Sequence, residues 1–153
     1  MEHPVTEMIT GTDLVEWQLR VASGQPLPLT QSEIFSRVKG CAVEARIYAE
    51  NPVADFLPCI GNLVHMRTPN DKPEISREPG VRVDSGVKTG GVVSMFYDPM
   101  IAKLIAYGPD RPTALKKLER GLRDFQVCFI VVWNIFHDFE YLLFHDFFAA
   151  AIK

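Results

Sequence analysis

Alternating apolar and polar residues predict β-strands through the middle of this chain. From residue 43 to residue 49 the odd positions are small or branched apolar residues and the even positions are charged or aromatic, which is typical of a half-buried strand beginning near residue 41. Residues 63–68 predict another strand. Residues 80–108 predict three more, separated by glycine-rich and Asp-Pro turns.

Helical spacing and capping residues predict one helix before these strands and one after them. Thr12 or Asp13 caps a helix that runs through about Ser23 and is closed by Gly24. Asp110 caps the second, which has a proline near its first turn. The predicted apolar stripes are Leu14, Trp17 and Val21 on the first helix, and Ala114, Leu115, Leu118, Leu122 and Phe125 on the second.

Prolines mark the connectors at residues 25–30, 51–61 and 69–79, and Ser32 is expected to cap a short turn through Phe35. The order of helix, antiparallel strands and helix predicts an α+β fold in which an antiparallel sheet is flanked by helices.

Arg82 is the residue in the predicted sheet that most suggests chemistry. Val81 and Val83 flank it, so in a strand its side chain points to the face opposite theirs. A buried sheet that keeps a few charged positions is typical of the wall of a functional site. The alternative is a solvated arginine on a half-exposed strand.

Composition narrows the class of protein. The chain has 153 residues, 47% apolar and 23% charged, which suits one soluble domain with or without an appendage. A net charge of −3 argues against nucleic-acid binding and against a polybasic membrane surface. Three cysteines without a C-x-x-C pattern favour a reducing compartment over a disulfide framework or a zinc site. The first residues show no targeting signal.

Four motifs resemble the biotin carboxylase family. They are EHPVTEMITGTDLVEWQLR at 2–20, EARIYAENP at 44–52, PGVRVDSG at 79–86 and YDPMIAKLIAYGPDR at 97–111. Within the family, the first two are most similar to the branch of methylcrotonoyl-CoA carboxylase alpha subunits, and VRVDSG is as similar to the propionyl-CoA branch.

The resemblance implies three segments. Residues 1–36 would be the tail end of the ATP-grasp catalytic module with a connecting helix, and residues 37–127 the biotin carboxylase C-terminal domain. Residues 128–153 form an apolar segment that diverges from the family. In the family several hundred residues precede this part, and a biotinyl domain follows it.

The family uses ATP to activate bicarbonate and then carboxylates biotin. By resemblance, Glu2 matches the general-base glutamate, and Arg82 matches the arginine that stabilises the biotin enolate and so contacts this cofactor. The whole enzyme would use biotin, ATP and Mg²⁺. By the resemblance, this chain would start inside the motif that carries the metal ligands. It has no glycine-rich phosphate loop, so we expect it to bind no metal, nucleotide or biotin alone and to be inactive.

The resemblance also implies partners and location. The whole enzyme would bind a carboxyltransferase beta subunit, form homo-oligomers and act in leucine breakdown in the mitochondrial matrix. Two other classes stay open: a non-catalytic interaction or dimerisation module that keeps only the C-terminal fold, and a small membrane-associated protein.

The segment 128–153 has three interpretations: a transmembrane helix interrupted by polar residues, a packed helix that replaces a family helix, or an unrelated sequence end. Its repeated F-H-D-F suggests metal binding, but His137 and His145 lie too far apart along a helix to share one ion. His3 and His65 are expected to be structural, and Asp98 and Lys103 to belong to the architecture of turn and strand.

Overall fold

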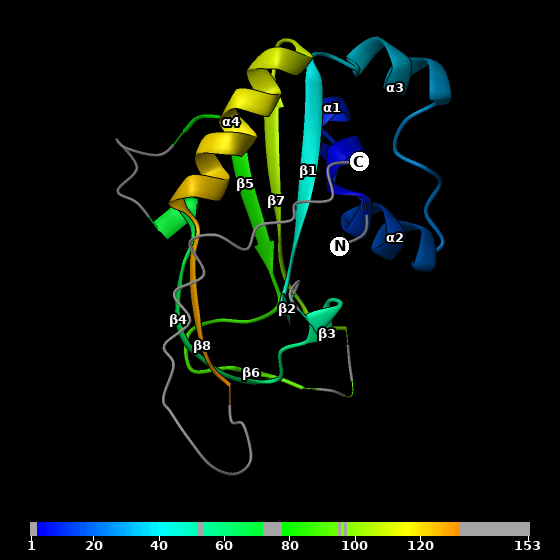
Figure 1. Cartoon of the computed structure of the whole chain (residues 1–153). Coiled ribbons are helices and arrows are strands. Elements are labelled where there is room, and N and C mark those ends of the chain that lie inside the picture. Colours follow the sequence, from blue (N-terminus) through cyan, green and yellow to red (C-terminus); the bar gives the residue numbers. More distant parts are fainter. Residues whose placement is uncertain (1–2, 52–53, 72–77, 95, 97, 132–153) are drawn as a thin grey trace, which may run out of the picture.

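The computed structural model describes residues 3–51, 54–71, 78–94, 96 and 98–131 (Figure 1). The helices are α1 (Pro4–Thr10), α2 (Leu14–Ala22), α3 (Gln31–Arg37) and α4 (Arg111–Asp124), with a short 3-10 turn η2 (Pro69–Asp71). The strands are β1 (Cys41–Tyr48), β2 (Glu50–Asn51), β3 (Leu57–Pro58), β4 (Gly61–Arg67), β5 (Val81–Ser85), β6 (Val92–Val93), β7 (Met100–Gly108) and β8 (Gln126–Val131).

The main sheet has the strand order β1-β7-β5, and both neighbouring pairs are antiparallel. Helix α4 packs against one face of it, and α1 packs against β1 and β7 on the other (Figure 1). Two smaller antiparallel sheets, β2-β3 and β6-β4-β8, complete the described fold. The predicted α+β class with an antiparallel sheet flanked by helices is confirmed.

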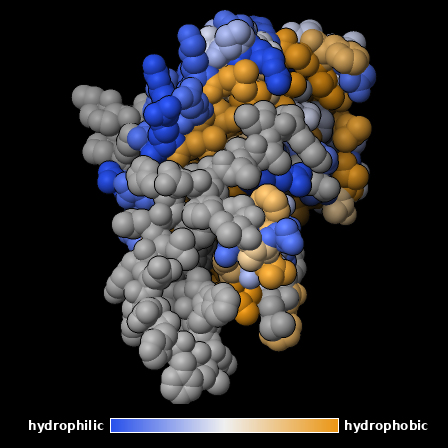
Figure 2. Space-filling view, viewed as in Figure 1, coloured by the Kyte–Doolittle hydropathy of each residue, from blue (hydrophilic) through white to orange (hydrophobic). Residues whose placement is uncertain are grey.

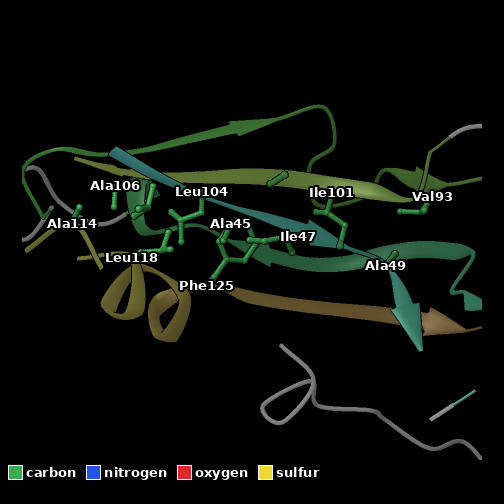
Figure 3. Packing of buried hydrophobic residues seen from close by; sticks show 12 residues of the cluster. Ala45, Ile47, Ala49, Val93, Ile101, Leu104, Ala106, Ala114, Leu118 and Phe125 are labelled. Carbon is green, nitrogen blue, oxygen red and sulfur yellow. The ribbon is translucent and has the colours of Figure 1, made fainter. Parts of the chain in front are cut away.

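The hydrophobic core lies between the main sheet and α4 (Figure 3). The odd positions of β1 that the alternation predicted as apolar are buried there, and each faces a buried residue of β7. Helix and sheet approach closely because Gly121 has no side chain: a Cβ there would lie 3.0 Å from the Leu104 Cδ2 atom. The buried set is Val43, Ala45, Ile47, Ala49, Val93, Ile101, Ala102, Leu104, Ala106, Ala114, Leu118 and Phe125.

Helix α4 forms as predicted. The Asp110 carboxylate caps it by accepting a hydrogen bond from the Thr113 N–H at 2.8 Å, and a proline occupies its first turn. Within the predicted apolar stripe, Ala114 and Leu118 are buried, and Leu115 and Leu122 pack partly buried against the core.

The three N-terminal helices differ from the prediction. Helix α1 is not among the predicted elements, and α3 is capped by a Thr30–Glu33 capping box instead of by Ser32. Asp13, not Thr12, caps α2. The stripe predicted for α2 is wrong in part, because Val21 is exposed and α2 contains no buried residue.

The small sheet β6-β4-β8 also departs from expectation. Strand β6 covers only two residues of the predicted central strand. Strand β8 is not among the predicted elements; it pairs with β4 from Arg67↔Gln126 to Gly61↔Val131, so residues 128–131 of the predicted apolar segment lie in a strand. Residues 132–153, with the F-H-D-F repeats, lie outside the described residues.

A membrane span was one interpretation of the apolar segment. Within the described part of the chain, every helix is too short or too polar to cross a bilayer.

Asp110 gives a pH-dependent test of the cap on α4. The hydrogen bond from the Thr113 backbone lowers the pKa of Asp110 below its ordinary value of 3.8. A carboxylate with a lowered folded-state pKa stabilises the fold above its unfolded pKa and loses this contribution as the pH falls through the folded pKa.

Asp110→Asn keeps an oxygen acceptor but removes the charge. We expect it to lower the urea midpoint of unfolding at pH 6, and the difference from the parent to shrink as the pH falls below 3.8 and through the lowered folded-state pKa of Asp110. Glu119→Gln on the exposed side of α4 is the control. A deficit that does not shrink at all as the pH falls well below 3.8 would contradict the assignment.

Candidate functional site

The face of the main sheet opposite α4 carries a row of charged side chains. The register places Arg82 on β5 and Glu44 on β1 on either side of Ile105, and Asp84 and Arg46 on either side of Lys103. Because facing residues of antiparallel strands share a face, the five charged side chains point away from the core, to the side of the sheet on which α1 packs. This confirms that Arg82 lies opposite Val81 and Val83, which pack against the core.

Within the part of the chain that the structure describes, the carboxylates of Asp84 and Glu7 hold Arg82. Asp84 accepts from both Nε at 2.7 Å and Nη2 at 2.9 Å, which is a two-point contact along one edge of the guanidinium. Glu7 accepts from Nη1 at 3.0 Å. The Arg82 side chain keeps 28% of its surface exposed, so it is neither fully solvated nor sealed in the fold. A guanidinium group that is hydrogen-bonded along two of its edges has a fixed orientation, which a freely solvated arginine lacks.

The Glu7 carboxylate adds a polar link between the N-terminal helices and the sheet. Its side chain is only 4% exposed. One carboxylate oxygen, Oε2, accepts from Arg82, and the other, Oε1, accepts from the Leu14 N–H at 2.9 Å. Glu7 therefore fixes the start of α2 and the orientation of Arg82 at the same time. Thr10, also buried, closes α1 by donating to the Thr6 carbonyl at 2.6 Å.

The two carboxylates also determine the electrostatics of this site. The hydrogen bond with Asp84 is the main cause that raises the pKa of Arg82 above its already high ordinary value, and Glu7 adds to it against the effect of burial. The guanidinium is charged at every physiological pH. Arg82 can therefore supply a permanent positive charge and planar donors, but not a proton.

A second ionic group lies beside the first on the same face. The Glu44 Oε1 atom lies 3.0 Å from Arg46 Nε and 3.6 Å from Lys103 Nζ, and the Lys103 side chain is only 7% exposed. Hydrogen bonds with Glu44 and then Tyr48 raise the pKa of Arg46. Lys103 thus has an ionic partner within the sheet, which supports its predicted architectural role.

The structure describes one of the two predicted catalytic residues, Arg82, but not the other. Glu2 lies outside the described residues, so its predicted approach to Arg82 stays a prediction. Asp98 accepts from the Met100 N–H at 3.0 Å as a turn residue does. Glu7 was missed by sequence reasoning; it stands inside the E-H-P-V-T-E motif, which was the only available signal.

Metal ligands do not gather in the described part of the chain, where no three His, Cys, Asp or Glu side chains lie close enough to hold one ion. His65 Nε2 instead lies 3.2 Å from Gln126 Oε1, across the β4–β8 pair. Cys41, Cys59 and Cys128 are all free thiols. Burial, and secondarily Glu50, raises the pKa of the Cys59 thiol.

Comparison with known proteins places this chain in a family. The model of the biotin carboxylase C-terminal domain matches residues 44–140, which is more than half of the chain. The chain therefore belongs to the biotin carboxylase family. A second model, the ATP-binding domain of the carbamoyl-phosphate synthase L chain, matches residues 1–30, the segment that contains α1 and α2.

Curated relatives indicate the branch of the family. The mitochondrial methylcrotonoyl-CoA carboxylase subunit alpha of Arabidopsis thaliana is 56% identical over 84% of this chain. The mitochondrial propionyl-CoA carboxylase alpha chain of Homo sapiens is 49% identical over 83%. The chain covers only 16% of the length of each of these relatives.

Solved structures show the same fold. The biotin carboxylase domain of the Hydrogenobacter thermophilus 2-oxoglutarate carboxylase, solved with Mg-ADP, ADP and bicarbonate, superposes with a TM-score of 0.73 at 37% identity. The match covers 83% of this chain and 26% of that one. The chain thus corresponds to about a quarter of that solved domain.

Proposed function

We propose that this chain is the C-terminal part of the biotin carboxylase module of an acyl-CoA carboxylase alpha subunit. The observation that carries the proposal is the Glu7–Arg82–Asp84 contact, which joins the E-H-P-V-T-E segment to the R-V-D strand. A permanently charged, oriented and partly exposed guanidinium on a sheet face is what a developing oxyanion requires.

The residues of this chain fit the ureido group of biotin. Arg82 offers planar donors for a ureido oxygen, and 28% of its side chain stays accessible. Biotin, when bound, supplies the ureido nitrogen that accepts the carboxyl group. Asp84 and Glu7 orient the guanidinium, and Arg82 stabilises negative charge where it develops. Glu2, by its motif, would take the bicarbonate proton.

The described residues do not fit ATP and Mg²⁺ in the same way. They contain no three-ligand cluster for a metal ion. We therefore assign nucleotide and metal binding to the rest of the module. On this basis the separate chain is expected to be inactive, because phosphoryl transfer depends on positioning and charge neutralisation.

The similarity to named relatives supports a finer assignment. The proposed substrate of the whole enzyme is methylcrotonoyl-CoA, and the proposed pathway is leucine breakdown. The reason is that the chain is 56% identical to the Arabidopsis methylcrotonoyl-CoA carboxylase subunit and 49% identical to the human propionyl-CoA carboxylase chain. The proposed partner is a carboxyltransferase beta subunit, and the proposed location is the mitochondrial matrix, as the names of both relatives include it.

The test uses a reconstructed chain, in which the portion of the Arabidopsis relative that precedes its match is joined to the whole of this chain. Biotin-dependent ATP hydrolysis in bicarbonate is expected from the reconstructed chain and not from the separate one. Arg82→Met should lower this kcat by at least about 100-fold, because it removes the donor aimed at the developing charge.

Arg123→Met is the matched control, because Arg123 is 77% exposed and forms a surface pair with Glu119 on α4. Its activity should stay within about twofold of the parent. If the two variants were equally active, Arg82 would have no part in the reaction. If the unmutated reconstructed chain were folded but inactive, the proposed function would be wrong.

A further inference from the structure

Lys103 is a buried cation to which the proposed function gives no role. Charged side chains usually lie at the surface, and Figure 2 shows such a hydrophilic surface over the outer side of α4. The Lys103 side chain is only 7% exposed, on the central strand β7 of the main sheet. Burying an ammonium group is costly unless negative charge lies close to it. The carboxylates around Lys103 therefore indicate what it does.

The Glu44 carboxylate serves two cations. Its Oε1 atom lies 3.0 Å from Arg46 Nε and 3.6 Å from Lys103 Nζ. At pH 7 the group formed by Glu44, Arg46 and Lys103 therefore carries one excess positive charge. This excess belongs mainly to Lys103, because Arg46 is closer to Glu44 and is 43% exposed to solvent, whereas Lys103 is buried.

The group around Arg82 has the opposite imbalance. Asp84 and Glu7 both bind Arg82, so two carboxylates surround one guanidinium. At pH 7 this group carries one excess negative charge. The two carboxylates orient Arg82, but they also oppose any negative charge that develops on a ligand beside it. A site that stabilises an oxyanion requires this excess to be cancelled.

The sheet register brings the two imbalances together. Lys103 on β7 faces Asp84 on β5, and both side chains lie on the face opposite α4. Facing residues of antiparallel strands have Cβ atoms about 5 Å apart. The excess positive charge of one group therefore lies beside the excess negative charge of the other, and the two groups together are neutral.

We propose that Lys103 is a positioning residue for Arg82, whose ammonium group cancels the excess negative charge that Asp84 and Glu7 bring to the guanidinium. Arg82 is then oriented by two carboxylates and still attracts an anion. The effect on catalysis rests on the proposed function, whereas the charge balance is a property of the fold itself. Removing the charge of Lys103 leaves the two groups with one excess negative charge on a partly buried face.

The first test measures urea unfolding of the full chain at pH 7. Lys103→Met keeps an unbranched side chain but removes the charge, and it should lower the midpoint by at least about 0.5 M. Adding Glu44→Gln to this variant restores neutrality without changing Arg82 or its two carboxylates, so at least about half of the loss should return. If Lys103 balanced Glu44 alone, the double variant would gain nothing, because Arg46 already neutralises Glu44 in Lys103→Met.

Lys88→Met is the matched control for the loss of a lysine charge. Lys88 is exposed in the segment between β5 and β6. Its replacement by methionine should shift the urea midpoint by less than about 0.2 M, because the charge of an exposed side chain is screened by solvent.

The second test measures biotin-dependent ATP hydrolysis by the reconstructed chain. Lys103→Met should lower kcat at least about tenfold and leave the KM for ATP within about twofold, because it acts where the oxyanion develops and not where the nucleotide binds. Adding Glu44→Gln should return kcat to within about threefold of the parent, an increase that a purely structural role of Lys103 does not predict. Lys88→Met should keep both constants within about twofold.

Three results would overturn the proposal: a double variant no more stable than Lys103→Met, equal midpoints for Lys103→Met and Lys88→Met, or an unchanged kcat for Lys103→Met in an active reconstructed chain. Failure of the proposed function is distinguishable from these. A folded but inactive reconstructed chain would contradict the proposed function, whereas recovery of stability in the double variant would still support the charge balance between Lys103 and the group around Arg82.

Discussion

Replacing Leu104 by alanine is expected to destabilise the chain by about 3 kcal/mol and to lower its melting temperature by roughly 6–12 °C. Leu104 is fully buried at the centre of β7, facing Ala45 on one side and Val83 on the other. Its methyl groups also lie against α4 at Gly121, where an added Cβ atom would be 3.0 Å from the Leu104 Cδ2 atom. The deleted atoms therefore leave a cavity that the sheet and α4 cannot easily close.

Urea denaturation of the full chain measures this loss directly. Leu57→Ala is the matched control, because Leu57 is 62% exposed on β3 and its truncation should cost less than about 0.5 kcal/mol. Equal losses for the two leucines would mean that the helix and sheet are not packed as described.

Truncating Glu7 to alanine is the other large effect that we expect, at about 3 kcal/mol. The substitution removes a nearly buried carboxylate that satisfies the Leu14 amide and forms an ion pair with Arg82. Glu7→Gln keeps an oxygen for one of these contacts and should lose about half as much. Chemical denaturation of the three proteins at pH 7 gives the comparison.

Glu119→Ala is the control that separates the effect of losing a buried carboxylate from the effect of losing an ion pair. Glu119 also pairs with an arginine, but both side chains are largely exposed, so its loss should lie near 0–0.5 kcal/mol. If Glu7→Ala cost no more than Glu119→Ala, Glu7 would not join α1 to the sheet.

Local patterns predicted the elements whose signals are local. Alternation in residues 43–49 identified β1 and its buried face, and Asp110 with a proline in the first turn identified α4. These predictions succeeded because side-chain periodicity and capping depend on neighbours within one turn or one strand.

The missed features depend on distant partners. Helix α1 is short, and Glu7 acquires its meaning only from Arg82, which lies far along the sequence. Strand β8 is defined by pairing with β4, and its apolar residues suited a helix equally well in the sequence. The stripe of α2 was wrong at Val21, which lies on the same side as Leu14 and Trp17 but is exposed, because periodicity does not show how much of a side is covered.

Arg82 could be selected from the sequence because its neighbours define a strand face. The two carboxylates that bind Arg82 were not predicted. Asp84, two positions away on the same face, was in principle readable, since residues two apart on a strand lie side by side. Glu2 stays a prediction from the motif alone.

The strand order has a consequence for synthesis of the chain on the ribosome. β1 has no partner in the main sheet until β7 has emerged, and β4 acquires its longest pairing only with β8, near the end of the described residues. Pairings between such distant segments form slowly, because a long loop must close before any contact rewards it. The nascent chain therefore exposes the apolar side of β1 while the residues between β1 and β7 are translated, and such exposed apolar surface favours chaperone binding.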